Sequence, residues 1–183
     1  MPASLRPSAG ACLLAMILMA TPWQPGAAQT SPPARAPAAA LPTVEGTAVA
    51  MTGDLITVGG TSVRLAGIAA PIPGETCQTR YGQTYDCYRR STDILQALIG
   101  DASVTCTITA TDRNGQKIGV CRAHDADLAS AITARGWAFA YRRLSPAYAG
   151  AEAFAESHRL GMWAGKVETP WQWRSRQLSD TAR

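Results

Sequence analysis

The sequence predicts an α+β domain built on a five-stranded β-barrel, with about three helices packed against it. Three observations predict this class: short runs of strand-forming residues, glycine-rich turns between them, and helical segments with start and stop signals. Of the 183 residues, 46% are hydrophobic and 16% are charged, which provides enough apolar material for one core and argues against a disordered chain.

The chain begins with a segment typical of a secretory signal peptide, expected to span residues 1–28. Arg6 supplies a positive charge, and an apolar stretch from Ala9 to Ala20 follows it. This stretch is shorter than the roughly 20 apolar residues that cross a bilayer, and small residues up to Ala28 favour cleavage there. A retained membrane anchor is the alternative. Cleavage predicts a periplasmic or secreted protein without membrane attachment, and it lowers the formal net charge from +4 to +3 because Arg6 is lost.

Three further segments divide the mature chain. Residues 29–42 form a linker rich in proline and alanine, residues 43–174 the folded domain, and residues 175–183 a polar tail that we expect to be frayed. The sequence contains no internal repeat and no long exposed apolar helix, so we expect a monomer.

Five strands account for the barrel. The dipeptides Thr52-Gly53 and Gly59-Gly60 separate the first three, and the tetrapeptide 112–115 (DRNG) is a turn signal between the last two. A long loop punctuated by glycine and proline, residues 69–86, follows the third strand. The expected strands are Thr43–Met51, Leu55–Val58, Ser62–Ile68, Val104–Ala110 and Lys117–Arg122.

Three helices follow from apolar spacing and from capping residues. Gly100 ends the first, while Asp127 caps the second and Gly136 ends it. The expected helices are Cys87–Ile99, Leu128–Arg135 and Ser145–Leu160, with a short apolar strand, residues 137–141, before the last. Together these elements predict a small Greek-key barrel of the OB type with helices packed on it.

Four cysteines remain once the signal, which contains Cys12, is removed. Cys106 and Cys121 lie equally far from the centre of the 112–115 turn, which predicts a disulfide across that strand pair, and Cys77 and Cys87 then close the long loop. An oxidising compartment favours disulfides over thiols. Zinc binding is the rival interpretation, but the sequence has no CxxC pair and only 2 histidines.

Several motifs, in the same order as these elements, resemble the staphylococcal nuclease family. They are TAVAMTGDLITV (47–58), SVRLAGIAAP (62–71), TDRNGQKIGVC (111–121), DLASAITARGWA (127–138) and HRLGMWAG (158–165). The four-cysteine pattern and the PWQWR segment (170–174) are similar to the exported bacterial branch of that family. Active members cleave the phosphodiester backbone of DNA or RNA with bound calcium. The resemblance therefore implies nucleic acid or another phosphate-rich ligand as partner.

The resemblance also implies a catalytic site that is only partly retained. Asp54 matches a calcium ligand of the family, and Arg64 matches an arginine that contacts phosphate. Ala69 and Ile72 stand where the family has a calcium-binding aspartate and a glutamate that acts as general base, and Gln116 stands where it has a second arginine. Because calcium takes about six to eight oxygen ligands, one retained carboxylate predicts weak calcium binding at most.

Nearby residues are candidates to replace the missing groups. Glu75, in the loop after Ile72, is a candidate substitute base, and the plainer interpretation is a solvated loop glutamate. Arg113 and Lys117 are either replacement cations or residues of the hairpin surface.

Asp54 and Arg64 are alternatively a structural salt bridge. A three-residue turn at 59–61, the register that we favour, places both residues on one face of the hairpin. A two-residue turn at 59–60 directs them to opposite faces.

Aromatic residues cluster in the second half of the chain. Tyr141, Arg142, Arg143 and Tyr148 are a candidate contact for nucleic acid or another anion. We expect Phe139 and the tryptophans at positions 137, 163, 171 and 173 to pack in the core, and a base-stacking platform is the alternative.

Taken together, these features predict an exported domain of nuclease fold that has lost hydrolysis and acts as a binding or structural module. A weak calcium-dependent nuclease that uses Asp54, Arg64 and Glu75 is the alternative.

Overall fold

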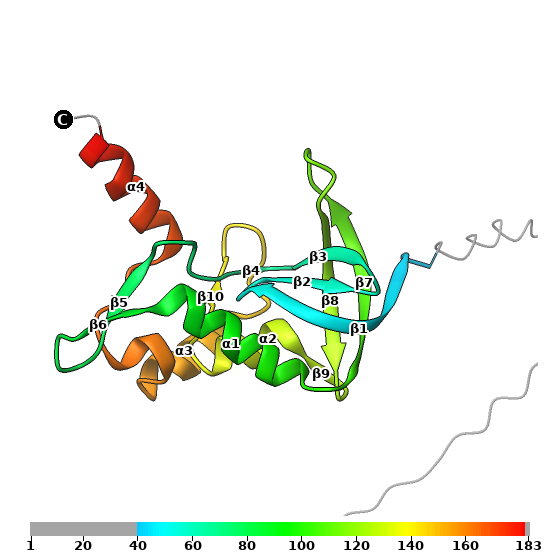
Figure 1. Ribbon diagram of the computed structural model, residues 1–183, viewed down its shortest axis with the longest axis horizontal. Helices are drawn as coiled ribbons and strands as arrows, with labels where there is room; N and C mark the ends of the chain where they lie inside the picture. Colours follow the sequence, from blue (N-terminus) through cyan, green and yellow to red (C-terminus); the bar gives the residue numbers. More distant parts are fainter. Residues whose placement is uncertain (1–39, 182–183) are drawn as a thin grey trace, which may run out of the picture. The chain divides into compact units, whose positions relative to one another are not determined.

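Five strands close into a β-barrel in the computed structural model, which describes residues 40–181 (Figure 1). Strand β1 pairs antiparallel with β2 and β7, β2 pairs with β3, and β7 pairs with β8. A parallel pairing of β3 with β8 closes the barrel. The strands are β1 (Thr43–Thr52), β2 (Leu55–Val58), β3 (Thr61–Leu65), β7 (Ser103–Thr111) and β8 (Lys117–Ala123). The predicted α+β class with a five-stranded OB-like barrel is thereby confirmed. The predicted signal peptide and most of the linker lie outside the described residues.

Apolar side chains from alternate positions of the strands fill the interior of the barrel. In β2 and β3 every second residue is buried, as expected for strands with one face toward a core. The buried set includes Ile56, Val58, Val63 and Leu65, and β7 adds Val104 and Ile108. Burial of such side chains contributes about 1.5–3 kcal/mol each relative to exposure, so this cluster is the main source of stability.

The turn between β2 and β3 has two residues, so the three-residue register is wrong. Val58 pairs with Thr61 and Leu55 pairs with Arg64, which leaves only Gly59 and Gly60 in the turn. Both glycines have positive φ, at 51° and 79°, as a two-residue hairpin turn with primed geometry requires.

Three helices cover the barrel near the places that the sequence predicts. Helix α1 (Cys87–Ile99) has the predicted bounds, and Asp86 caps it by accepting a hydrogen bond from the backbone N of Arg89. Helix α2 (Leu128–Ala134) is capped by Asp127, as expected. Helix α3 (Ala149–Ser157) is shorter than predicted, because the residues before it form turns and direct Tyr148 into the core.

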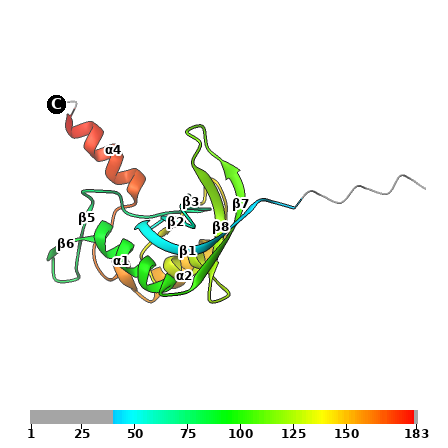
Figure 2. The same ribbon diagram turned by 45° about the vertical axis from the view of Figure 1, so that its right-hand side comes forward.

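The fourth helix, α4 (Pro170–Thr181), was not predicted, and the expectation of a frayed tail is wrong for the described part of that tail. The segment Thr169 to Gln172 forms a capping box: the Thr169 backbone N donates to Gln172 Oε1 at 2.9 Å, and the Gln172 backbone N donates to Thr169 Oγ1 at 3.4 Å. Pro170 occupies the first helical position, where proline is favoured. Both views show α4 extending away from the barrel (Figures 1 and 2).

Short elements complete the domain. The loop predicted for residues 69–86 contains a hairpin of β5 and β6, and residue 68 belongs to a separate strand because Gly67, with φ of 74°, interrupts β3. Among the described residues, no helix combines the length and apolar character that crossing a membrane requires. The remaining elements are β4 (Ile68–Ala69), β5 (Thr76–Gln78), β6 (Thr84–Asp86), β9 (Ala126–Asp127), β10 (Phe139–Ala140) and the 3-10 helix η1 (Gly161–Ala164).

Two disulfides brace the domain, with the predicted pairing. Cys106 and Cys121 are directly paired across β7 and β8, with 4.0 Å between their Cα atoms. Cys77 and Cys87 link β5 to the start of α1, with 5.6 Å between their Cα atoms. In the chain-entropy model, each bridge contributes about 2–3 kcal/mol.

Candidate functional site

A cleft of about 320 Å³ opens at the side of the barrel. Its barrel wall comes from the turn between β1 and β2, from β3, and from the loop after β4. Its helix wall comes from the first two turns of α4. The residues that matter below are Thr52, Asp54, Arg64, Ala69, Ile72, Tyr141, Trp171 and Arg174.

The turn that carries Asp54 is fixed by its contact with α1. A Cβ at Gly53 would overlap the hydroxyl of Ser91, so only glycine allows the turn to approach the helix this closely. Ser91 is held in turn, because its hydroxyl donates to the backbone O of Trp137 at 2.6 Å. The carboxylate of Asp54 therefore has a defined position at the edge of the cleft.

Both oxygens of the Asp54 carboxylate are engaged. Oδ1 accepts a hydrogen bond from the hydroxyl of Thr52 at 2.7 Å, and Oδ2 lies 2.7 Å from Nη1 of Arg64 in a salt bridge. The side chain of Asp54 is 12% exposed and that of Arg64 is 42% exposed. The ion pair forms despite the two-residue turn, because Asp54 lies in the turn before β2, outside the strand pleat that would direct it to the other face.

The other positions that match the family's catalytic groups contribute no charge to the cleft. Ala69 and Ile72 line it with methyl and methylene groups. Gln116 does not line the cleft. Its side chain is held on the barrel surface, because Nε2 donates to the backbone O of Ser62 and to that of Lys117, each at 3.0 Å. Neither Arg113 nor Lys117 lines the cleft.

Glu75 is buried, so the expectation of a solvated loop glutamate is wrong. Its residue is 1% exposed, and its Oε2 accepts a hydrogen bond from the backbone N of Ile72 at 3.0 Å. Its Oε1 has no hydrogen-bond partner among the described residues. Burial raises the pKa of the Glu75 carboxyl, while the hydrogen bond from Ile72 and the positive charge of Arg174 oppose the rise. Glu75 is not one of the residues that line the cleft.

The helix wall supplies a second cation. Arg174 lines the cleft from α4, is exposed, and forms no salt bridge with a described residue. Trp171 anchors this wall: its ring centroid lies 6.2 Å from that of Phe139 and 5.7 Å from that of Tyr141. Sequence analysis missed Arg174 as a site residue because it missed α4, although the capping box at Thr169–Gln172 is a sequence signal for that helix.

These residues do not fit the calcium ion that active members of the family use. Among the cleft-lining residues Asp54 is the sole carboxylate, and its charge is already balanced by the salt bridge to Arg64. Calcium takes about six to eight oxygen ligands, several of them carboxylates. Over residues 40–181, no three side chains of the His, Cys, Asp or Glu type form a group able to hold a metal. With two guanidiniums and one carboxylate, the cleft has a formal charge of +1 and suits an anion better than a cation.

The predicted aromatic and cationic cluster is divided: Tyr141, Arg142 and Arg143 together line a further small pocket, whereas Tyr148 belongs to the core. Tyr141 lines the cleft, but Arg142 is paired with Glu152 at 2.7 Å. Tyr148 is buried, and its hydroxyl donates to Asp127 Oδ2 at 2.9 Å, which together with burial raises the pKa of the phenol. Phe139 is fully buried and the tryptophan rings at positions 163 and 171 pack against it edge to face.

The fold and the cleft define a class: an OB-like barrel whose side cleft presents an arginine from β3. The model of the staphylococcal nuclease homologue family matches residues 62–165, more than half of the chain, so the protein belongs to this family. A curated relative is the succinoglycan biosynthesis protein ExoI of Rhizobium meliloti (strain 1021). It is 29% identical over 134 residues, which cover 72% of this chain and 70% of the relative.

Proposed function

We propose that this protein is an exported binding module of the nuclease family that has lost metal-dependent hydrolysis. The observation that carries the proposal is the charge balance of the cleft, in which Asp54 is the sole carboxylate among the lining residues and is already paired with Arg64. A hydrogen-bonded carboxylate can still give a metal ion one oxygen ligand, but no second carboxylate lines the cleft to approach the roughly six to eight oxygens that calcium takes. Without a metal, the negative charge that develops on phosphate during hydrolysis lacks its main source of stabilisation.

The ligand that the cleft suits is a phosphate-rich anion, with nucleic acid as the first candidate. Arg64 and Arg174 face the cleft from opposite walls, and guanidinium groups bind phosphate through paired hydrogen bonds. The mature chain carries more basic than acidic residues, which favours association with a polyanion. The name of the relative refers to succinoglycan biosynthesis, so an acidic polysaccharide is a useful competitor in binding assays.

Export is part of the proposal. Residues 1–28 have the composition of a signal peptide, and the two disulfides are typical of proteins that fold in an oxidising compartment. The periplasm and the medium both meet this condition.

Incubation of the mature protein with single-stranded DNA and millimolar calcium tests the proposal. We expect no cleavage above a buffer control. The informative gain-of-function variant combines Ala69→Asp, Ile72→Glu and Gln116→Arg, which restores the missing groups on the same scaffold. Robust calcium-dependent cleavage by the unmodified protein, abolished by Asp54→Ala, would contradict the proposal.

A weak nuclease that uses Asp54, Arg64 and Glu75 is the second candidate. The observation in its favour is Glu75 itself, whose Oε1 lacks a partner among the described residues and whose pKa is raised by burial. A general base near neutral pH benefits from such a shift. This candidate requires the loop at 72–75 to turn outward, and it predicts that Glu75→Gln strongly lowers cleavage. An unchanged rate in that variant removes Glu75 from the mechanism.

A further inference from the structure

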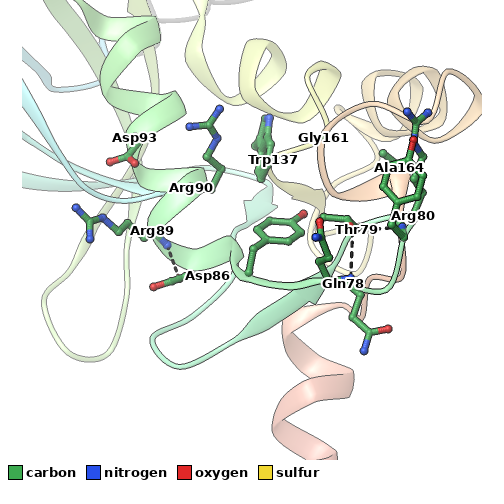
Figure 3. A pocket seen from close by; sticks show the side chains of 14 residues that line it. Gln78, Thr79, Arg80, Asp86, Arg89, Arg90, Asp93, Trp137, Gly161 and Ala164 are labelled. Carbon is green, nitrogen blue, oxygen red and sulfur yellow. Dashed lines mark hydrogen bonds between the residues drawn. The ribbon is translucent and has the colours of Figure 1, made fainter.

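A larger pocket, of about 720 Å³, lies apart from the cleft and shares no lining residue with it. The β5–β6 hairpin, the first turns of α1, Trp137 and η1 form its walls. Figure 3 shows Arg90 beside Trp137 on one side of the pocket and Arg80 on the other side. None of the residues matched to the family's catalytic positions takes part in it.

Covalent and hydrogen-bonded links fix the walls in place. The Cys77–Cys87 disulfide ties the hairpin to α1. Gln78 and Lys166 exchange two backbone hydrogen bonds of 3.1 Å, which tie the same hairpin to the segment after η1. A Cβ at Gly165 would overlap the backbone of Gln78, so this close approach requires glycine. The pocket is therefore largely pre-formed, as ligand sites usually are.

Aromatic rings form the apolar part of the pocket. Tyr85 and Trp137 pack edge to face, with ring centroids 6.3 Å apart and planes at 76°, and neither ring is fully buried. Tyr81, at the hairpin turn, is 74% exposed. Partly exposed aromatic rings that line a pocket, with a more exposed ring beside them, can serve as platforms for planar groups such as nucleobases.

Unpaired cations surround these rings. The Arg90 guanidinium lies 5.9 Å from the Trp137 ring centroid, and that of Arg80 lies 4.7 Å from the Tyr81 ring centroid. Arg89 is a third lining arginine, and none of the three forms a salt bridge with a described residue. Asp86 and Asp93 add two carboxylates, so the lining keeps a formal excess of one positive charge. Arginines stacked on rings and free of ion pairs favour a ligand that combines anionic groups with planar ones.

We propose that this pocket binds single-stranded nucleic acid, independently of the cleft. Unpaired bases stack against Tyr85, Trp137 and Tyr81, and the intervening phosphates contact the arginines. A duplex does not fit this arrangement, since its bases are already stacked on each other and their faces are not available.

Fluorescence anisotropy with two labelled probes tests the proposal: an oligothymidylate of about 12 nucleotides and an abasic oligomer of the same length. We expect the mature protein to bind the oligothymidylate about tenfold more tightly, because only that probe has bases to stack. Tyr81→Ala and Tyr85→Leu should reduce this preference. Tyr81→Ala keeps the test valid if Tyr85→Leu fails to fold, because the side chain of Tyr81 is exposed.

The arginines are tested by charge reversal. Arg80→Glu combined with Arg90→Glu should weaken the binding of both probes and lower the slope of log affinity against log salt by about 1.4, at roughly 0.7 per lost phosphate contact. Arg113→Glu, at an exposed hairpin position that lines neither cavity, is the matched control. Arg174→Gln, in the cleft, should leave the preference for bases unchanged. The proposal for the pocket and the proposal for the cleft can therefore be refuted independently of each other.

Three results would overturn the assignment. Equal affinity for the two probes would show that the surface binds only charge. Oligothymidylate binding that survives the double arginine reversal when it is combined with Arg174→Gln, which removes the cation that α4 contributes to the cleft, would place the nucleic acid outside the pocket. Competition by an acidic polysaccharide such as alginate at the same concentration as the oligothymidylate would show that the pocket prefers another polyanion.

Discussion

The two walls of the cleft differ in how their charges are used. On the barrel wall Asp54 and Arg64 neutralise each other in a salt bridge, and Ala69 and Ile72 add only apolar surface. On the helix wall Arg174 remains free of any salt bridge with a described residue. The helix wall also lies beyond residues 62–165, the segment that matches the family. The difference teaches that the net positive charge of the cleft comes from α4, because the charges of the barrel wall balance each other.

The largest expected effect is a loss of stability when the disulfide that braces the barrel is removed. Replacement of Cys106 and Cys121 by alanine should lower the free energy of unfolding by about 3 kcal/mol, because the bridge closes a loop of 15 residues inside the barrel. Denaturation with guanidinium chloride measures this. The matched variant lacks Cys77 and Cys87, which close a loop of 10 residues, and it should lose less stability. A larger loss of unfolding free energy in the second variant would contradict the expectation that the Cys106–Cys121 bridge is the more stabilising of the two.

The next effect concerns the helix wall. Arg174→Gln should weaken the binding of phosphate-rich ligands about tenfold, because charge-assisted hydrogen bonds are worth about 1.5–3 kcal/mol. Its thermal stability should stay the same, since Arg174 is exposed. Isothermal titration with pyrophosphate, which has no base to stack in the second pocket, measures this change, and Arg113→Gln is the control. Unchanged affinity in Arg174→Gln would remove α4 from the site.

Asp54 distinguishes the two candidate functions by the sign of its effect. Asp54→Asn keeps a hydrogen-bonding group beside Thr52 and Arg64 but removes the negative charge, so anion affinity should rise about threefold, as expected for loss of a partly exposed ion pair. A calcium-dependent nuclease would instead lose activity and substrate affinity. Two binding titrations of the variant, one with calcium and one with a chelator, separate these outcomes, because only the nuclease candidate predicts an affinity loss that requires calcium.

The smallest effect is a change in the pH dependence of stability. Burial raises the pKa of Glu75 above its usual value of 4.5, so the folded protein retains this proton at pH values where the unfolded chain has lost it. Stability is then lost as the pH rises from 4.5 through the raised pKa. Glu75→Gln should flatten the dependence of melting temperature on pH over this range, while Glu45→Gln, at an exposed position, should not. An identical pH profile for Glu75→Gln and the unmodified protein would mean that the buried carboxyl does not keep its proton.

Much of the fold could be predicted because it depends on local signals. Apolar alternation indicated the barrel strands, Gly100 and the cap at Asp127 marked helix ends, and the 112–115 turn predicted the Cys106–Cys121 bridge. Sequence reasoning was wrong where distant groups decide the outcome. The burial of Glu75 depends on how the disulfide-tied loop folds back, and neighbouring residues do not report it.

The site was less predictable than the fold for two physical reasons. The prediction for the Asp54–Arg64 contact assumed that both residues follow strand alternation. Asp54 instead lies in a turn, which Gly53 allows to approach α1 closely, and the salt bridge forms from there. Arg174 was missed because the polar composition of α4 hides a helix that begins with a capping box and a first-position proline.

Thermal unfolding of the mature protein, with calcium and with phosphate added separately, tests the central claim most directly. A ligand that binds the native state must raise the melting temperature. If the cleft holds anions and no divalent cation, millimolar phosphate raises the melting temperature, Arg174→Gln reduces that rise, and millimolar calcium has no effect. A calcium-induced rise that Asp54→Ala abolishes would contradict the account.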